Sequence, residues 1–460
     1  CKRQLTSWYH GSSKDLLRGA IIIAKYQYPG LDQKHIYEFI ERVRRDCWLE
    51  LNPNMTAFES IRIINKVLFG QYGFSGNSKN YNSPLNSFLN TVIETKKGNP
   101  LSLSILYSVI AQELKLPTLT RAAALSILMS ESKSVAVAGT HGKTTTSSML
   151  AVALQACGAD PSFAIGGTIT ASGSNAHRGT GEIFVAEADE SDGSFIEYHP
   201  FAAIVTNVEH DHVDFFETAE SVAQAFRDFA ATIQAGGFLT YCADDAGAVA
   251  LAQSTRSIEL ISYGVNETAD LHLDQIELLT MGSRARAIWK GKSVGHIELQ
   301  VPGHHNLLNA AGVLATGLKL GFAPAELLTG LGNFRGTGRR FEVKGTVHGI
   351  RVIDDYGHHP TEIHVTLEAA RRFADAGRLI VIFQPHRYSR TQAFAQQFAK
   401  ELDVADRAIL LEVYAASEKP IEGVNSKIIT SKMSKGEYIP NFVEVTDSVI
   451  ADAQPGDVIM

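Results

Sequence analysis

The residues with the clearest chemical potential form a glycine-rich loop, Gly139-Thr140-His141-Gly142-Lys143-Thr144-Thr145. A short apolar run, 134–138, precedes this loop, and a helical pattern follows it to about Ala156. Such loops direct backbone N–H groups and a helix N-terminus at phosphate oxygens. Lys143 can reach the β- and γ-phosphates, and Thr144 can ligate Mg²⁺. The spacing departs from GxxxxGK[ST] because Val137 stands at the first glycine position. We therefore predict a variant ATP-binding loop; a tight turn that carries a lysine by chance is the alternative.

Two polar runs follow β-rich segments further along the chain. Glu187 opens an acidic run, 187–192, after the apolar residues 183–186, and His212 belongs to the run 206–214. Carboxylates at the carboxyl ends of parallel strands face the crevice in which ligands bind. We predict Thr144, Glu187 and His212 as metal ligands for Mg²⁺. The alternatives are a solvated acidic turn for the first run and a zinc site or surface loop for the second. Zinc is disfavoured because no cysteine joins the histidines.

These groups suit acyl activation by ATP. A substrate carboxylate attacks the γ-phosphate, cations neutralise the developing charge, and an amine then displaces phosphate. We expect Lys143, Glu187 and His212 to be the catalytic residues of such a reaction.

Composition limits the class of protein. The chain has 460 residues and a net charge of −7, which gives no reason to expect nucleic acid as a partner. The four cysteines lie far apart without a CxxC pair, which fits a reducing cytosol. The longest apolar stretches are too short to span a bilayer, and no secretory signal opens the chain. We predict a cytoplasmic enzyme without membrane insertion.

The charge distribution indicates a module boundary near residue 117. Residues 1–117 hold 15 Lys/Arg against 9 Asp/Glu, whereas the other 343 hold 27 against 40. The first segment shows helical spacing of apolar residues, with a capping box expected at Thr56 and Glu59. The later segment alternates short strands with amphipathic helices, which predicts an α/β fold with parallel sheets and helices on both faces. The strands are expected at 134–138, 183–186, 203–206, 379–383 and 408–411.

The three polar runs, in this order, resemble the central domain of Mur ligases. Four later runs extend the resemblance: 302–310, 334–341, 354–362 and 384–390. By this resemblance, Asn306 and Asn309 contact adenine, an arginine at the entry to the C-terminal domain reaches the phosphates, and Asp354 or Asp355 serves the nucleotide. The expected ATP-binding residues outside the loop are Asn306, Asn309, Arg339, Arg340, Asp354 and Asp355.

The runs 354–362 and 384–390 most resemble the Mur ligases that add L-alanine to UDP-N-acetylmuramate. The resemblance implies that Tyr356, His358, Arg387 and Arg390 bind L-alanine, and that Asn175 lies near the muramyl substrate. A bidentate arginine suits an amino-acid carboxylate. The implied reaction consumes ATP in peptidoglycan precursor synthesis. The alternatives are the Mur ligase that attaches recycled tripeptide to UDP-N-acetylmuramate, and an inactive Mg-ATP-binding fusion or fragment.

Residues 1–117 resemble instead the N-terminal part of SirB-type transglutaminase-like proteins. The resemblance rests on runs such as 45–53, 73–81 and 97–104. No cysteine stands in the nucleophile region around Ser102, so we do not expect catalysis there. The glycine loop of the UDP-binding domain of Mur ligases is not visible before Gly139. We predict a helical transglutaminase-like fragment with no identified partner (1–117), a central ATP-binding domain (118–330) and a Rossmann-like C-terminal domain (331–460) that stops within a strand.

Overall fold

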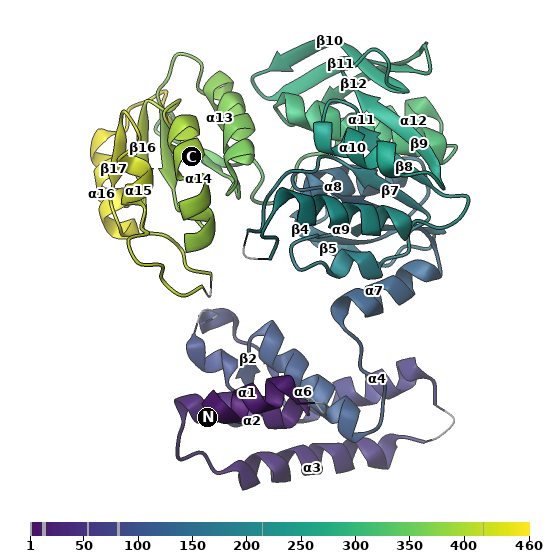
Figure 1. Cartoon of the computed structure of the whole chain (residues 1–460), viewed down its shortest axis with the longest axis vertical. Coiled ribbons are helices and arrows are strands. Elements are labelled where there is room, and N and C mark those ends of the chain that lie inside the picture. The colour runs from purple at the N-terminus through teal and green to yellow at the C-terminus, as the bar shows by residue number, and fades with distance from the viewer. Residues whose placement is uncertain (1, 12–14, 53–54, 81–82, 214, 417) are drawn as a thin grey trace. The chain divides into compact units, whose positions relative to one another are not determined.

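The computed structural model describes residues 2–11, 15–52, 55–80, 83–213, 215–416 and 418–460; Asp214 of the predicted polar run lies outside these ranges. The chain divides into two compact units, Cys1–Thr120 and Arg121–Met460 (Figure 1). Each unit has its own hydrophobic core. Among the described residues, no helix combines the length and apolarity needed to cross a membrane.

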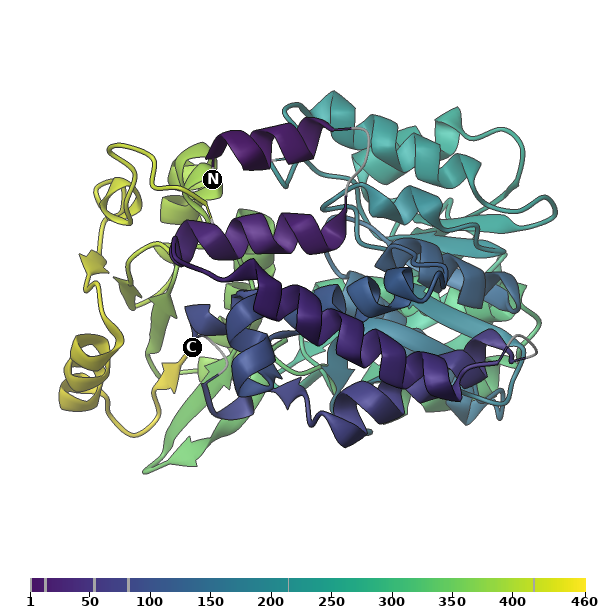
Figure 2. The same cartoon turned by 90° about the horizontal axis from the view of Figure 1, so that it is seen from below.

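The N-terminal unit is helical, as the apolar spacing predicted. Helix α6 packs against α2, α3, α4 and α5, which are the purple and blue ribbons of Figure 2. The capping box at the start of α4 is confirmed: Thr56 N–H donates to Glu59 Oε2 at 2.8 Å, and Glu59 N–H donates to Thr56 Oγ1 at 3.2 Å. The helices are α1 (Lys2–His10), α2 (Leu16–Gln27), α3 (Gln33–Glu50), α4 (Ala57–Asn65), α5 (Leu89–Thr95) and α6 (Pro100–Glu113), with a π-helical turn at Lys66–Gln71 and 3₁₀ turns at Ser78–Asn80 and Pro84–Ser87. Two short parallel strands, β1 (Ser75–Gly76) and β2 (Lys97–Gly98), complete the unit.

A ten-stranded sheet forms the centre of the second unit. Its order is β12-β11-β10-β9-β8-β7-β3-β6-β4-β5, and the strands from β10 to β4 are parallel. The predicted parallel sheet is confirmed, with β3, β6 and β7 at the three segments expected as strands. The antiparallel strands β5, β11 and β12 were not predicted, and β5 and β12 form the two edges. The strands are β3 (Lys133–Ala138), β4 (Ser162–Ile169), β5 (Ser174–His177), β6 (Ile183–Glu187), β7 (Ala202–Val205), β8 (Phe238–Cys242), β9 (Glu259–Gly264), β10 (Leu271–Leu279), β11 (Gly282–Trp289) and β12 (Lys292–Leu299).

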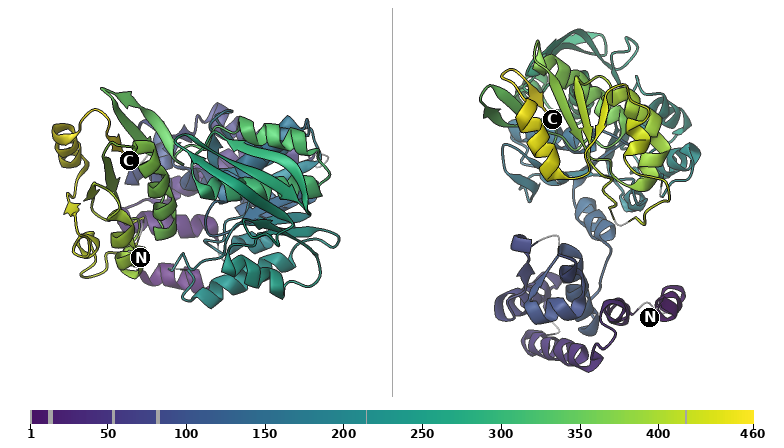
Figure 3. Two further views of the ribbon diagram at one scale, coloured as in Figure 1. Left: turned by 90° about the horizontal axis from the view of Figure 1, so that it is seen from above. Right: turned by 90° about the vertical axis from the view of Figure 1, so that its left-hand side faces the viewer.

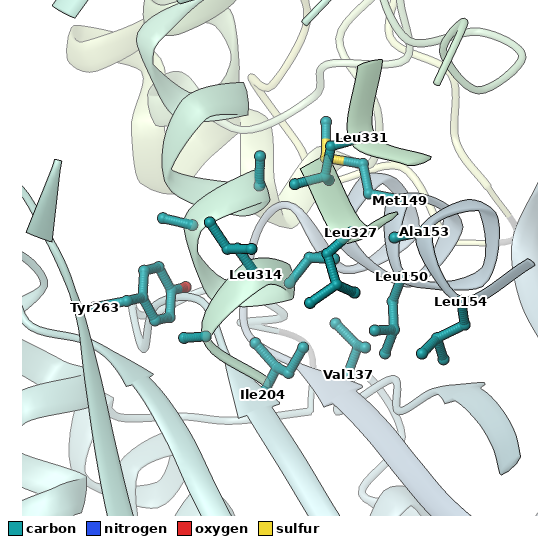
Figure 4. Close-up of a cluster of buried hydrophobic side chains, with 14 of the residues drawn as sticks. Val137, Met149, Leu150, Ala153, Leu154, Ile204, Tyr263, Leu314, Leu327 and Leu331 are labelled. Atoms are coloured by element: carbon teal, nitrogen blue, oxygen red, sulfur yellow. The ribbon is translucent and has the colours of Figure 1, made fainter. Parts of the chain in front are cut away.

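Helices cover both faces of this sheet because alternate strand residues point to opposite sides. Val135 and Val137 pack with α8 (Lys143–Ala156), α11 (His304–Lys319) and α12 (Pro324–Asn333) (Figure 4). Ala136 and Ala138 pack toward α7 (Arg121–Ser130), α9 (Ala219–Ala231) and α10 (Ala246–Ser254). A 3₁₀ turn, Ser194–Glu197, adds Phe195 to the second face. The neighbouring strands β3, β6 and β7 therefore bury apolar side chains on both faces, as expected for a doubly covered parallel sheet.

The C-terminal part of the unit forms a six-stranded sheet of order β13-β14-β18-β15-β16-β17. Helices α13 (Pro360–Ala374), α14 (Tyr388–Leu402) and α15 (Lys427–Thr430) cover one face, and α16 (Phe442–Asp452) covers the other (Figure 3). Only the β13–β14 pair is antiparallel among the described strands of this sheet. The strands are β13 (Glu342–Val347), β14 (Ile350–Asp354), β15 (Leu379–Phe383), β16 (Arg407–Leu410), β17 (Gly436–Tyr438) and β18 (Val458–Ile459).

The order β7-β3-β6 determines where the functional loops meet. These three strands are parallel neighbours, so their carboxyl ends lie side by side at one edge of the sheet. The glycine loop follows β3, the acidic run follows β6, and the run 206–212 follows β7. Three segments that are far apart in the sequence thus come together.

The packing of the core predicts how much the free energy of unfolding falls when a buried side chain is truncated. Leu314 on α11 is fully buried in the core of the ten-stranded sheet, whereas Leu279 on β10 is 52% exposed. We expect Leu314→Ala to lower the free energy of unfolding by about 2–5 kcal/mol, because it leaves a void in a packed core. Leu279→Ala should change it by less than about 0.5 kcal/mol. Urea unfolding of the full chain measures both; equal effects would contradict the described packing.

Candidate functional site

The glycine loop has a backbone that only glycine adopts without strain. Gly139 has φ +134° and Gly142, the N-cap of α8, has φ +83°. A Cβ at Gly139 would lie 2.0 Å from Thr206 Oγ1, and one at Gly142 would lie 2.8 Å from Asn309 Oδ1. The run after β7 fixes the loop from outside, because His141 N–H donates to Asn207 Oδ1 at 2.8 Å. The loop is therefore tightly enclosed, with its N–H groups at the start of a long helix, which suits a phosphate group.

Lys143 is buried in the loop and held by several acceptors. Its Nζ donates to Gly139 O at 2.8 Å and to the two carboxylate oxygens of Glu190 at 3.1 and 2.9 Å. Burial alone would lower the pKa of Lys143, but the carboxylates of Glu190 and Asp189 outweigh it and raise the pKa. The ammonium therefore stays charged at the position where phosphates would bind. Glu190 belongs to the acidic run 187–192, but no pattern in the sequence identified it as the partner of Lys143.

Two groups of metal-ligating side chains stand beside Lys143. Thr144 Oγ1 donates to Glu187 Oε1 at 2.9 Å, so the structure brings these two predicted ligands together. His212 lies instead with Glu190 and Asp189, and the ligand atoms of these three residues are within 4.8 Å of one another. Hydroxyl and carboxylate oxygens are the donors that Mg²⁺ prefers. The donor set of Thr144 and Glu187 thus fits the predicted ion.

A first cavity adjoins the loop on the side of α11. Asn306 and Asn309 are buried there, and Asn306 Nδ2 donates to Pro302 O at 2.7 Å. Burial, reinforced by His304 and Arg340, lowers the pKa of His305 to about 4, so this wall is uncharged at neutral pH. A pocket with an uncharged wall beside a phosphate loop suits a nucleobase. The predicted ATP-binding residues on its lining are His141, Gly142, Thr144, Thr145, Asn306, Asn309, Arg340 and Asp355.

Two further predicted nucleotide residues, Arg339 and Asp354, lie beside Arg340 and Asp355 near the entry to the C-terminal domain. Arg340 Nη1 donates to Glu362 Oε1 at 3.2 Å, and Asp355 accepts N–H groups from Phe341 and Gly357. Arg339 lies 3.9 Å from Asp354 and stacks on the ring of Tyr356 at 4.6 Å. Asp354 is not part of the lining described for either cavity.

A second, larger cavity joins the two domains of this unit. It brings the predicted catalytic residues of the central domain together with four predicted L-alanine residues of the C-terminal domain. The predicted residues on its lining are Thr140, Gly142, Lys143, Thr144, Glu187, His212, Arg339, Arg340, Tyr356, His358, Arg387 and Arg390. Asn175 is exposed on the edge strand β5 and is not part of either described lining.

Arg390 makes a buried ion pair across the two domains. Its Nε and Nη2 both donate to Asp211 Oδ1 at 3.0 Å, and both side chains are at most 3% exposed. Burial would raise the pKa of Asp211, but Arg390 and the neighbouring histidines hold it well below its ordinary range. The sequence had no signal for this pair, because its partners lie 179 residues apart.

Comparison with known families matches three parts of the chain. Residues 137–317 match the Mur ligase middle domain, residues 339–460 match the Mur ligase, glutamate ligase domain, and residues 33–159 match the transglutaminase-like superfamily. The resemblances predicted from sequence motifs are confirmed.

Similar proteins extend this result. The chain is 48% identical over 355 residues to the UDP-N-acetylmuramate–L-alanine ligase of Paenarthrobacter aurescens, covering 76% of each chain. It is 47% identical over 357 residues to the ligase of the same name from Acidothermus cellulolyticus, covering 76% of this chain and 75% of that one. The crystal structure of a UDP-N-acetylmuramate-alanine ligase from Thermotoga maritima superposes with a TM-score of 0.63 at 28% identity over 77% of each chain.

The pair between Asp211 and Arg390 yields a stability prediction. Arg390→Met leaves the buried carboxylate of Asp211 without a counter-charge, so we expect a loss of about 3–5 kcal/mol in the free energy of unfolding. The double variant Asp211→Asn/Arg390→Met should recover much of this loss. Arg372→Met, which removes an exposed pair with Glu368 on α13, should cost no more than about 0.5 kcal/mol. Urea unfolding of the three variants measures these changes in the free energy of unfolding. If Arg390→Met lost as little as Arg372→Met, the buried ion pair would be refuted.

Proposed function

Because this chain belongs to the Mur ligase family, we propose that it joins L-alanine to UDP-N-acetylmuramate with hydrolysis of ATP to ADP and phosphate. The larger cavity carries this proposal, since it gathers Lys143, Glu187 and His212 with Tyr356, His358 and Arg387 in one space. We prefer L-alanine to a recycled tripeptide because the similar ligases from both bacteria above are named for L-alanine.

In the first step, a carboxylate oxygen of the muramyl lactyl group bonds to the γ-phosphorus while the bond to the β-phosphate oxygen breaks, which leaves ADP and an acyl phosphate. Carbonyls of its own loop and Glu190 hold the ammonium of Lys143, which supports the role proposed for it in this step. Its fixed ammonium stabilises negative charge on the transferring group. Mg²⁺, held by Thr144 and Glu187, would supply further charge neutralisation when bound.

In the second step, the amine of L-alanine attacks the acyl carbon and phosphate leaves. The amine must first lose a proton, and His358 is suited to accept it. Its Nδ1 lies 2.9 Å from Tyr356 O, which can only accept, so the ring proton is on Nδ1 and the Nε2 lone pair is available. Burial lowers the pKa of His358, which keeps the ring neutral at physiological pH although Glu362 acts in the opposite direction. His358 is our proposed general base.

Arg387 is the proposed partner of the L-alanine carboxylate. It lines the larger cavity, and its backbone is fixed in the left-handed region at φ +71° by an N–H that donates to Tyr414 O at 2.8 Å. Strained backbone is often concentrated at functional sites. Arg390, the other predicted arginine, is already paired with Asp211, so we assign it to holding the two domains together.

The proposal predicts substrate-dependent phosphate release. In the presence of ATP and Mg²⁺, release should require both L-alanine and UDP-N-acetylmuramate. We expect Lys143→Ala to reduce the rate by at least about 10²-fold, because it removes a fixed cation from the transition state. Lys400→Ala, on an exposed part of α14, serves as the control and should keep the full rate. Unchanged turnover in Lys143→Ala would exclude this site, and release without either substrate would exclude the ligase reaction.

A further inference from the structure

The side chain of His141 lies between carboxylates from two domains. Its Nε2 is 3.5 Å from Glu209 Oε2, which follows β7 in the central domain. Its Nδ1 is 3.5 Å from Glu362 Oε1, in the first turn of α13 in the C-terminal domain. We propose that His141 is a positioning residue: as a cation it links the phosphate loop to α13, so that the closed arrangement of the domains and the nucleotide-binding form of the loop support each other. This inference rests on the proposed binding of ATP.

Glu209 is attached to the opposite domain, whereas Glu362 is held by residues of its own domain. Glu209 Oε2 accepts from Thr361 Oγ1 at 2.8 Å, so a residue of the central domain contacts α13 directly. Glu362 accepts from Arg340 Nη1 at 3.2 Å and from the N–H of His358 at 2.9 Å. The first turn of α13 therefore meets the phosphate loop through two acids and one imidazole. Removal of the imidazole would leave the buried carboxylate of Glu362 and the carboxylate of Glu209, which is 34% exposed, without the ring between them.

The backbone of His141 transmits this contact to the loop. Its N–H donates to Asn207 Oδ1 at 2.8 Å, and its carbonyl accepts from Asn207 Nδ2 at 3.1 Å and from Thr206 Oγ1. The next residues are Gly142 and Lys143, which line the cavity for phosphates. A shift of α13 away from the central domain would thus act on the backbone immediately before the catalytic lysine.

The charge on His141 follows from its surroundings. Burial would lower its pKa, but Glu209 and Glu362 outweigh burial and raise it to about 9. The ring of His359 lies 4.6 Å away, and its pKa is lowered to about 4 by burial and by His141, so it adds no charge near neutral pH. Arg340 is the other cation at Glu362. The imidazolium of His141 is therefore the group that balances Glu209.

A metal ion is the alternative occupant of this cluster, and the geometry disfavours it. The ligand atoms of His141, Glu209 and His359 lie within 4.8 Å of one another. The two imidazole rings lie against each other, with centroids 4.6 Å apart and an interplanar angle of 33°. His359 Nδ1 also accepts the N–H of Thr361 at 3.3 Å, which leaves the ring proton on Nε2. A proton on His141 is the better account of the site.

The linkage has a defined pH dependence. The pKa of His141 is raised from its ordinary value of 6.5 to about 9 when the two carboxylates face it. A group with a raised pKa stabilises the arrangement fully below its ordinary value, and this contribution is lost as the pH rises through the raised value. The contact between the loop and α13 should therefore weaken between pH 6.5 and 9 and be absent above that range.

Two measurements on the full chain test the proposal, with His141→Gln as the main variant. Hydrogen exchange in residues 358–363, which cover the segment before α13 and its first turn, is compared among variants at the same pH without ligand. Calorimetry gives the Kd for ATP with Mg²⁺ at pH 7.5 and 9.5. We expect faster exchange in His141→Gln at pH 7.5, and an ATP affinity that is about tenfold weaker than in the wild type and independent of pH. The wild type should lose about tenfold in affinity between the two pH values.

Two further variants complete the test: one is a matched control on the same helix, and the other removes a second contact between the two domains. His364→Gln lies on the same helix and removes an exposed histidine paired with Glu401, so it should behave as the wild type. Thr361→Val removes the hydrogen bond to Glu209 without touching the loop, and should speed exchange to a smaller extent. The linkage would be overturned if both His141→Gln and Thr361→Val exchanged hydrogen at the wild-type rate. It would also be overturned if the ATP affinity of His141→Gln depended on pH as in the wild type. Neither readout needs ligase turnover, so failure of the proposed reaction would be seen separately.

Discussion

The site depends on one buried ammonium group. Lys143 lies beneath the phosphate loop, where a lone charge would cost several kcal/mol in lost hydration. Glu190 offsets this cost with both carboxylate oxygens, and the carbonyls of Gly139 and Thr140 complete its coordination. The same contacts hold the loop after β3 against the acidic run after β6. The arrangement that keeps the lysine charged is therefore also the arrangement that shapes the cavity.

Local patterns in the sequence were sufficient to predict the elements that form the phosphate loop. The apolar run 134–138, the glycines at 139 and 142, and the helical pattern to Ala156 predicted a strand, a phosphate loop and a helix, and the structure has β3, the loop and α8 at these residues. Such signals are local because they follow from steric limits at single residues and from the period of each element. The antiparallel strands β11 and β12 were not predicted, although residues 284–287 of β11 alternate between arginine and alanine. Their place beside β10 depends on strand pairing, which no local pattern shows.

Contacts between domains could not be predicted from local patterns. Thr361 meets Glu209 across 152 residues, and Arg390 meets Asp211 across 179. An acidic run and an arginine-rich run are both visible in the sequence, but no local pattern indicates which residues of the two runs pair. The family resemblance also implied that both Arg387 and Arg390 bind L-alanine, whereas Arg390 pairs with Asp211. The assignment of Arg387 and Arg390 to different partners requires knowledge of which surface of α14 the central domain covers.

The order of the six-stranded sheet has a consequence for synthesis of the chain. β18 is the last of the six strands in sequence, yet it lies between β14 and β15 and pairs with both. During translation, residues 350–354 and 379–383 emerge well before the strand that joins them. Until residue 459 has left the ribosome, β14 and β15 each present an open edge, the kind of surface that invites mispairing. The ten-stranded sheet has no such delay, because all of its strands are complete by residue 299. The nucleotide-binding half can therefore fold co-translationally, while the half that closes over it must wait for its central strand.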